Sequence, residues 1–146
     1  MRFILLIVFA LFSFNVYADG MPTLNMDQLM TEVKSHSAKT MVVFWAPWCP
    51  FCMKELKIIR DNPDFVKNNN LQVIGLTKKP DKSRAIAFVE KENMPFKFFI
   101  GEQEIYDRLQ KIDAVPLTLV YGSDGKLLDY EYGKQSVEDL ALMLED

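Results

Sequence analysis

The two cysteines of this 146-residue chain, Cys49 and Cys52, are the side chains whose type and spacing most directly suggest chemistry. A disulfide between them would close a very short loop and would therefore add little to the stability of the fold. Paired thiols at this spacing can instead exchange a disulfide with another molecule, because one thiolate attacks and the second thiol releases the mixed disulfide. We expect Cys49 to attack and Cys52 to resolve.

The composition disfavours a metal or haem at this pair. Half of a zinc site would need two further Cys or His ligands, and the chain has a single histidine, His36. Haem attachment through C-x-x-C would need a histidine at the next position, which is Met53. A lone histidine also disfavours a Cys–His or Ser–His dyad. We expect no metal and no cofactor beyond the redox-active pair itself.

A predicted strand and a predicted helix hold the cysteines. Residues 40–45, TMVVFW, form an apolar run without polar alternation, which is typical of a strand buried on both faces. A loop leads to Cys49, and Pro50 fits the first position of a helix because its missing N–H would have no partner there. The dipole and free N–H groups at this helix end would stabilise a Cys49 thiolate, and Cys52, one turn further on, should be more buried.

The rest of the chain alternates predicted helices and strands and ends in a hairpin and a helix, which indicates an α/β layer fold. The predicted elements are a linker at 21–24, a helix from Asn25 or Asp27 to about Ser37, a turn of helix at 64–68, a helix at 83–91 capped by Asp81, a helical segment at 102–109, a final helix at 137–144, and strands at 71–76, 96–100, 116–121 and 127–132.

The N-terminus has the features of a secretory signal. Arg2 is followed by an unbroken apolar run over residues 3–12, and the later tripeptide VYA fits a cleavage site at its end. The run is shorter than the roughly 20 apolar residues that cross a membrane, and an uncleaved membrane anchor is the alternative. We expect a signal peptide at 1–18, a single domain at 19–146, and export to the periplasm.

Residues 44–52, FWAPWCPFC, resemble the active-site stretch of thioredoxin-like proteins. The chain as a whole is most similar to the exported TlpA/ResA group, which includes the thioredoxins of cytochrome c maturation. The resemblance covers nearly all of residues 19–146. It includes a C-x-x-C-x-x-E pattern that ends at Glu55, a Val-Pro step before a strand, and the turn DGK at 124–126.

This resemblance implies a thioredoxin fold, with a central mixed β-sheet flanked by helices and an inserted strand–helix region, here around residues 71–93. It also implies that Pro116 is cis and packs beside the disulfide. The backbone of the preceding residue, Val115, would then pair with the substrate.

Two departures from thioredoxin itself make Glu55 the candidate proton carrier. Thioredoxin has a buried aspartate six residues before its first cysteine, and that position is Val43 here; the aspartate's lysine partner would fall near Gly75. In the resembled group a glutamate matching Glu55 lies near the thiols. If partly buried, Glu55 would have a raised pKa and could carry a proton to or from Cys52. The alternative is a solvated glutamate whose only role is a favourable interaction of its negative charge with the helix dipole.

The remaining candidates are residues that could contact a substrate. Trp48 directly precedes the first cysteine, and Pro50 and Phe51 stand between the two. We place these three with Val115 and Pro116 at the substrate-binding surface. Phe51 cannot give a thiolate the hydrogen bond or the positive charge that a histidine would give, so a strongly lowered thiol pKa is not expected.

The cysteine pair and the resemblance together lead us to expect a periplasmic thiol–disulfide oxidoreductase that acts on protein substrates. The leading hypothesis is a monomeric reductase that a membrane electron-transfer partner keeps reduced. The alternatives are a net oxidant that donates disulfides to folding exported proteins, and a non-catalytic binding or chaperone module of the same fold. The net charge of −3 provides no basic surface for nucleic acid.

Overall fold

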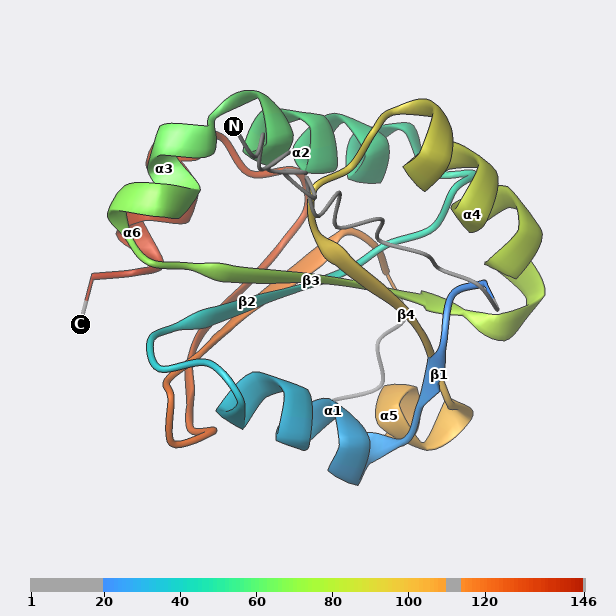
Figure 1. Ribbon diagram of the computed structural model, residues 1–146, viewed down its shortest axis with the longest axis horizontal. Coiled ribbons are helices and arrows are strands. Elements are labelled where there is room, and N and C mark those ends of the chain that lie inside the picture. Colours follow the sequence, from blue (N-terminus) through green and yellow to red (C-terminus); the bar gives the residue numbers. More distant parts are fainter. Residues whose placement is uncertain (1–19, 110–113, 146) are drawn as a thin grey trace, which may run out of the picture.

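A computed structural model describes residues 20–109 and 114–145, so the predicted signal at 1–18 lies outside the described residues. The described chain forms one six-stranded sheet in the order β1-β4-β3-β2-β5-β6 (Figure 1). The strands are β1 (Thr23–Leu24), β2 (Thr40–Phe44), β3 (Gln72–Lys78), β4 (Lys97–Gly101), β5 (Leu117–Tyr121) and β6 (Leu127–Tyr132). Strands β1, β4, β3 and β2 run parallel, and β5 and β6 are each antiparallel to the preceding strand in this order, so the sheet is mixed, as predicted.

Helices cover both faces of this sheet (Figure 1). One face carries α2 (Pro50–Asp61), α3 (Pro63–Asn68), α4 (Lys82–Lys91) and α6 (Val137–Leu142); the other carries α1 (Met26–Lys34) and α5 (Gln103–Arg108). A short 3-10 helix, η1 (Lys79–Asp81), leads into α4. Within the described residues, no helix combines the length and apolarity needed to cross a bilayer.

The central strand β2 precedes the loop that leads to the cysteines. All five of its residues are buried, and it lies between β3 and β5, which confirms the prediction of a strand covered on both faces. The region 71–93, where the resemblance implies an added strand and helix, contains β3 and α4. Strand β4 follows and separates β3 from β1 in the sheet.

The apolar core is divided by the sheet into two clusters. On the side that we call the α2 face, the cluster includes both cysteines and draws buried residues from α2, α4 and α6, such as Leu56, Ala85 and Leu140. On the side that we call the α1 face, it draws residues from α1 and α5, such as Leu29 and Ile105. The disulfide is therefore part of one hydrophobic layer and absent from the other.

Several predicted boundaries differ from the observed ones by one to three residues, and a predicted linker contains a strand. Residues 21–24 are not only a linker, because Thr23 and Leu24 pair with β4 and form the edge strand β1. The first helix is capped by Asn25, one of the two caps predicted, but it ends at Lys34 rather than near Ser37. The chain needs the residues after Lys34 to turn back into β2, and this tertiary requirement leaves no periodic signal in the sequence.

Candidate functional site

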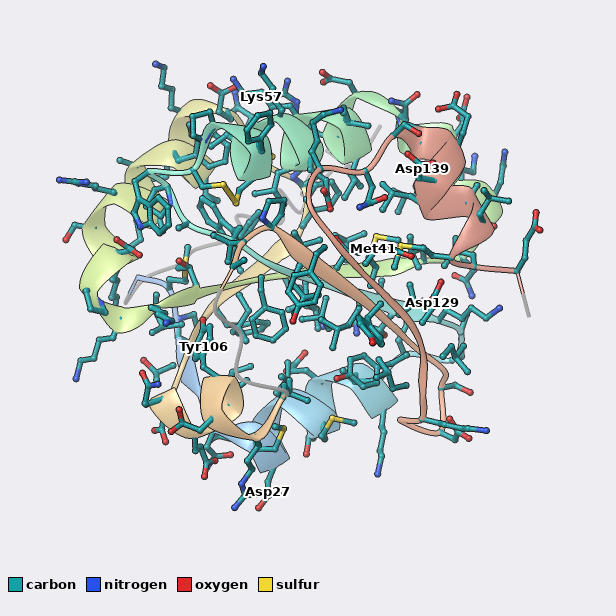
Figure 2. The ribbon with its side chains drawn as sticks, turned by 180° about the vertical axis from the view of Figure 1, so that it is seen from behind. Asp27, Met41, Lys57, Tyr106, Asp129 and Asp139 are labelled. Atoms are coloured by element: carbon teal, nitrogen blue, oxygen red, sulfur yellow. A yellow bond between two sulfur atoms is a disulfide. The ribbon has the colours of Figure 1, made fainter. Side chains whose placement is uncertain are left out.

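Cys49 and Cys52 form a disulfide at the start of α2, drawn in yellow in Figure 2. Their Cα atoms are 5.4 Å apart. Cys49 is the N-cap residue of α2, and Pro50 follows in the first turn, as predicted. The Sγ atom of Cys49 accepts the backbone N–H of Cys52 at 3.2 Å. One of the free N–H groups at the helix start therefore points at the sulfur on which a thiolate would form.

The two cysteines are both buried, whereas the aromatic residues beside them are exposed. Cys52 is fully buried and Cys49 retains 5% of its exposure, so the predicted order of burial is confirmed. Trp48 and Phe51 are 61% and 59% exposed, although both are large apolar side chains. Exposed aromatic rings next to a reactive pair give an apolar surface on which another polypeptide can dock.

The segment before β5 reaches the disulfide because β2 and β5 are antiparallel. Phe44 at the end of β2 pairs with Leu117 at the start of β5, so the chain enters β5 at the same end of the sheet where β2 leads to the cysteines. The Val115–Pro116 peptide is cis, as the resemblance implies. The carbonyl oxygen of Val115 lies 3.7 Å from the Sγ atom of Cys49. Residues 66 positions apart in the sequence thus meet at the site.

Glu55 is buried in the same layer as the cysteines. Its side chain has no exposed area, so the alternative of a solvated glutamate is wrong. The hydroxyl of Thr118 donates to Oε1, and the backbone N–H of Gln135 donates to Oε2 at 2.8 Å. Burial raises the pKa of Glu55 above its ordinary value, while these two hydrogen bonds and the charge of Lys134 oppose the rise. Glu55 follows Cys52 by three positions on α2, which places both side chains on one face of the helix.

The two positions that depart from thioredoxin lie side by side. Val43 on β2 pairs with Gly75 on β3 and, on its other side, with Thr118 on β5. A Cβ atom at Gly75 would overlap the ring of Phe98, so this position has no space for a lysine or any other side chain. The buried carboxyl of this protein therefore comes from helix α2 and is anchored on β5, next to the strand position that is Val43.

Trp48 is held by a residue that was predicted to do something else. Its Nε1–H donates to the Oδ2 atom of Asp81 at 3.2 Å. Asp81 was expected to cap the next helix, but its side chain makes no capping hydrogen bond to α4. Because the carboxylate faces the indole instead, Asp81 helps to orient the aromatic ring beside Cys49.

Sequence reasoning missed three partners at this site: Thr118, Gln135 and Asp81. Thr118 left a weak signal, because it is a polar residue within the otherwise apolar strand run PLTLVY. Gln135 acts through its backbone N–H, to which the identity of the side chain gives no clue. The position of Asp81 in the sequence suited a helix cap and gave no sign of its contact with Trp48.

His36 lies in a structural contact, with Nε2 2.7 Å from the carbonyl oxygen of Asn70. Across residues 20–109 and 114–145, no three His, Cys, Asp or Glu side chains come together in a group that could hold a metal ion.

Comparison with known proteins places this arrangement in a wider group. Residues 26–146 match a family described as the thioredoxin-like domain. A curated relative, the thiol-disulfide oxidoreductase ResA of Bacillus cereus, is 23% identical over 97 residues, which are 66% of this chain and 56% of the relative. The chain thus spans only a little more than half the length of that relative.

Solved structures share the fold. The crystal structure of StoA from Bacillus subtilis superposes with a TM-score of 0.63 at 19% identity, covering 75% of this chain and 84% of StoA. A secreted Mycobacterium tuberculosis disulfide oxidoreductase, homologous to Escherichia coli DsbE, gives a TM-score of 0.59 at 21% identity, covering 78% and 84% of the two chains. At these identities the likeness establishes the thioredoxin fold that the sequence predicted.

Proposed function

This chain belongs to the family of thioredoxin-like domains, and from that premise we propose that it is a thiol–disulfide oxidoreductase acting on protein substrates. The observation that carries the proposal is the Cys49–Cys52 disulfide at a helix start, flanked by two exposed aromatic rings. The Val115 carbonyl beside Cys49 supplies a backbone acceptor with which an extended substrate segment can pair.

The reaction in the reducing direction begins with the dithiol form. The Cys49 thiolate attacks one sulfur of the substrate disulfide, the substrate S–S bond breaks, and the released substrate thiolate takes a proton from water. Cys49 is now joined to the substrate in a mixed disulfide. The Cys52 thiolate then attacks the sulfur of Cys49, the second substrate thiolate leaves, and the Cys49–Cys52 disulfide forms. Two electrons have passed from the protein to the substrate.

Glu55 supports the second step in this scheme. Cys52 must lose its proton before it attacks, and it is shielded from water. The Glu55 carboxylate, three positions along the same helix, can accept that proton and later release it to solvent. Its pKa, raised by burial, brings the carboxyl group closer to the pKa of a thiol and makes it a better base.

The environment of Cys49 favours reduction as the direction of net electron flow. A strong oxidant of this kind has a reduced form in which the attacking thiolate is strongly stabilised. Here the thiolate would receive one backbone N–H and the helix dipole. Phe51 contributes neither charge nor a hydrogen bond, and the nearby Lys54 ammonium is 5.8 Å from the Phe51 ring centroid. A weakly stabilised thiolate favours the disulfide form of the protein, which makes the dithiol a good electron donor.

We further propose that the protein works as a monomer in the periplasm and is re-reduced by a membrane electron-transfer partner. The support for export is the signal-like pattern of residues 1–18, in which a charged start precedes an apolar run. A reductase in an oxidising compartment needs a supply of electrons from elsewhere, and a membrane protein can bring them across from the cytosol.

The direction of electron flow is tested by the reduction potential of the Cys49–Cys52 pair, measured by equilibration of residues 19–146 with glutathione buffers. We expect a value near or below that of thioredoxin, about −270 mV. A value near that of DsbA, about −120 mV, would contradict the reductase proposal and make the protein a disulfide donor.

A further inference from the structure

The Glu55 carboxyl group is anchored by two residues that the reaction scheme does not use. Thr118 lies on β5, 63 positions away in the sequence, and Gln135 lies in the loop before α6, 80 positions away. Each donates one hydrogen bond to a different carboxyl oxygen. Both oxygens are therefore oriented by elements outside the helix that carries the glutamate.

Thr118 is placed for this contact by its register in the sheet. It is fully buried, and it shares the α2 face of β5 with Val120 alone, because alternate strand residues point to opposite faces. Its hydroxyl is the only polar side-chain group that β5 presents to that face. A valine of the same shape would pack equally well but could not donate to Glu55.

The Gln135 loop connects the carboxyl group to the segment beside the disulfide. The Gln135 side chain donates to the carbonyl oxygens of Tyr132 at 3.1 Å and Gly133 at 2.8 Å. Gly133, which has a φ of +82°, in turn donates its N–H to the carbonyl oxygen of Pro116 at 2.9 Å. The side chain of Gln135 thus fixes the loop in the shape that directs its own N–H at Glu55.

We propose that Thr118 and Gln135 are positioning residues that hold the Glu55 carboxylate in the orientation in which it takes the proton of Cys52. The inference rests on the proposed function, because it concerns the resolving step of that reaction. In that step a proton moves from Cys52 Sγ to a Glu55 oxygen, and the freed sulfur electron pair attacks Cys49. The S–S bond to the substrate breaks, and the substrate leaves as a thiolate.

The groups around Glu55 define how the two hydrogen bonds act. Cys52 lies on the same face of α2 as Glu55, and Lys134 in the loop before α6 contributes a positive charge. Thr118 on β5 and its pairing partner Val43 on β2 are uncharged. Hydrogen bonds from an O–H and an N–H stabilise the carboxylate more than the neutral acid. They keep the carboxyl group ionised, and so able to accept a proton, to a lower pH than burial alone would allow.

The experiment measures the rate at which the mixed disulfide is resolved as a function of pH, using a preformed adduct of Cys49 with a small thiol in each variant. The rate should fall at low pH as Glu55 becomes protonated, and we call this part of the pH profile the acid limb. Thr118→Val should move this acid limb upward by about one pH unit, because a hydrogen bond to a charged group is lost. Thr118→Ser keeps a hydroxyl and should restore the original limb.

Three further variants separate positioning from packing. Gln135→Ala, which frees the loop, should move the limb in the same direction as Thr118→Val. Thr77→Val is the matched control, because Thr77 is a fully buried threonine on β3 whose hydroxyl has no hydrogen-bond partner among the described residues. It should leave the limb in place. In a Glu55→Gln background, Thr118→Val should cause no additional change.

An acid limb that does not move in Thr118→Val would overturn the inference. A further loss of rate when Thr118→Val is added to Glu55→Gln would overturn it as well. If the proposed function itself is wrong, the experiments should give a different result. In that case the wild-type protein would not exchange disulfides, or its exchange would survive Cys49→Ser, whatever residue stood at position 118.

Discussion

The two faces of the sheet both bury titratable side chains, but burial has different consequences on each. On the α2 face, burial raises the pKa of Glu55 from an ordinary value of 4.5 and so moves it toward neutral pH. On the α1 face, burial raises the pKa of Tyr106 as well, and raises that of Tyr121 to about 12. Burial favours the uncharged form in every case, so it moves the pKa of the carboxyl group toward neutral pH and the pKa values of the two tyrosines further above it.

Glu55 and Tyr106 also differ in their hydrogen-bond partners. Glu55 receives two hydrogen bonds, whereas the Tyr106 hydroxyl has no hydrogen-bond partner among the described residues. The Tyr106 ring, which points from α5 toward the sheet in Figure 2, instead packs edge-on against Phe44 with the ring centroids 5.5 Å apart. Tyr106 is thus a packing residue. The difference fits the proposed function, in which the α2 face carries the thiols and the proton-accepting carboxyl group and the α1 face stabilises the sheet by packing.

Matched core truncations on the two faces should give the largest effects. Leu29 on α1 and Leu56 on α2 are both fully buried. Each change to alanine should lower the free energy of unfolding by about 3 kcal/mol, measured in urea. Leu142→Ala is the control, since Leu142 is 61% exposed, and should change it by less than about 0.5 kcal/mol.

The same variants distinguish the faces in function. Leu56 lies one turn beyond Cys52 on α2, so Leu56→Ala should also slow disulfide exchange by the folded protein. Leu29→Ala should leave that rate unchanged at temperatures where the variant is folded. An equal slowing by Leu29→Ala would mean that the α1 face takes part in the chemistry after all.

Glu55→Gln should slow resolution of the mixed disulfide by about 100-fold at neutral pH, because the resolving thiol loses its base. The initial attack by Cys49 should change much less. Stopped-flow measurement with a fluorescent disulfide substrate resolves the two steps. Unchanged thiol pKa values together with unchanged exchange rates would exclude the role given to Glu55.

The same substitution should change how stability depends on pH. The folded protein raises the pKa of Glu55, so wild-type stability from this group is greatest below the unfolded value of about 4.5 and is lost as pH rises through the folded pKa. The Glu55→Gln variant does not lose stability in this way, because glutamine does not ionise. The variant should therefore gain stability relative to wild type as pH increases above about 4.5. A stability difference that is the same at acid and neutral pH would contradict the raised pKa.

Tyr106→Phe should give the smallest effect. It removes a buried hydroxyl that has no partner, so the free energy of unfolding should rise by about 1 kcal/mol or stay the same. Disulfide exchange should be unaffected over the whole pH range. A loss of stability of several kcal/mol would show that the hydroxyl has a partner in solution.

The parts of the site that follow each other in the chain could be predicted from the sequence. The strand of residues 40–45, the helix start at Cys49 and the position of Pro50 all leave local signals of apolar patterning and turn chemistry. The resemblance to known proteins added the cis peptide before Pro116. These features depend on residues within a few positions of one another or on a motif that is shared across a family.

The contacts between distant segments could not be predicted in this way. The hydrogen bonds from Thr118 and Gln135 to Glu55 depend on strand register and loop shape, which a local pattern does not specify. Edge strand β1 is only Thr23–Leu24, too short for an alternating pattern, and exists because β4 lies next to it. Asp81 shows a further limit, since its position suited a helix cap but its carboxylate binds the Trp48 indole.

The roles of Cys49 and Cys52 can be tested by covalent trapping with single-cysteine variants and a disulfide-containing peptide, followed by mass spectrometry. We expect Cys52→Ser to accumulate a mixed disulfide between Cys49 and the peptide, because the resolving thiol is missing. Cys49→Ser should form no such adduct and should lose exchange activity. Undiminished exchange by Cys49→Ser would exclude Cys49 as the attacking thiol. Absence of exchange and of adducts in the wild-type protein as well would identify a binding module that uses the thioredoxin fold without its chemistry.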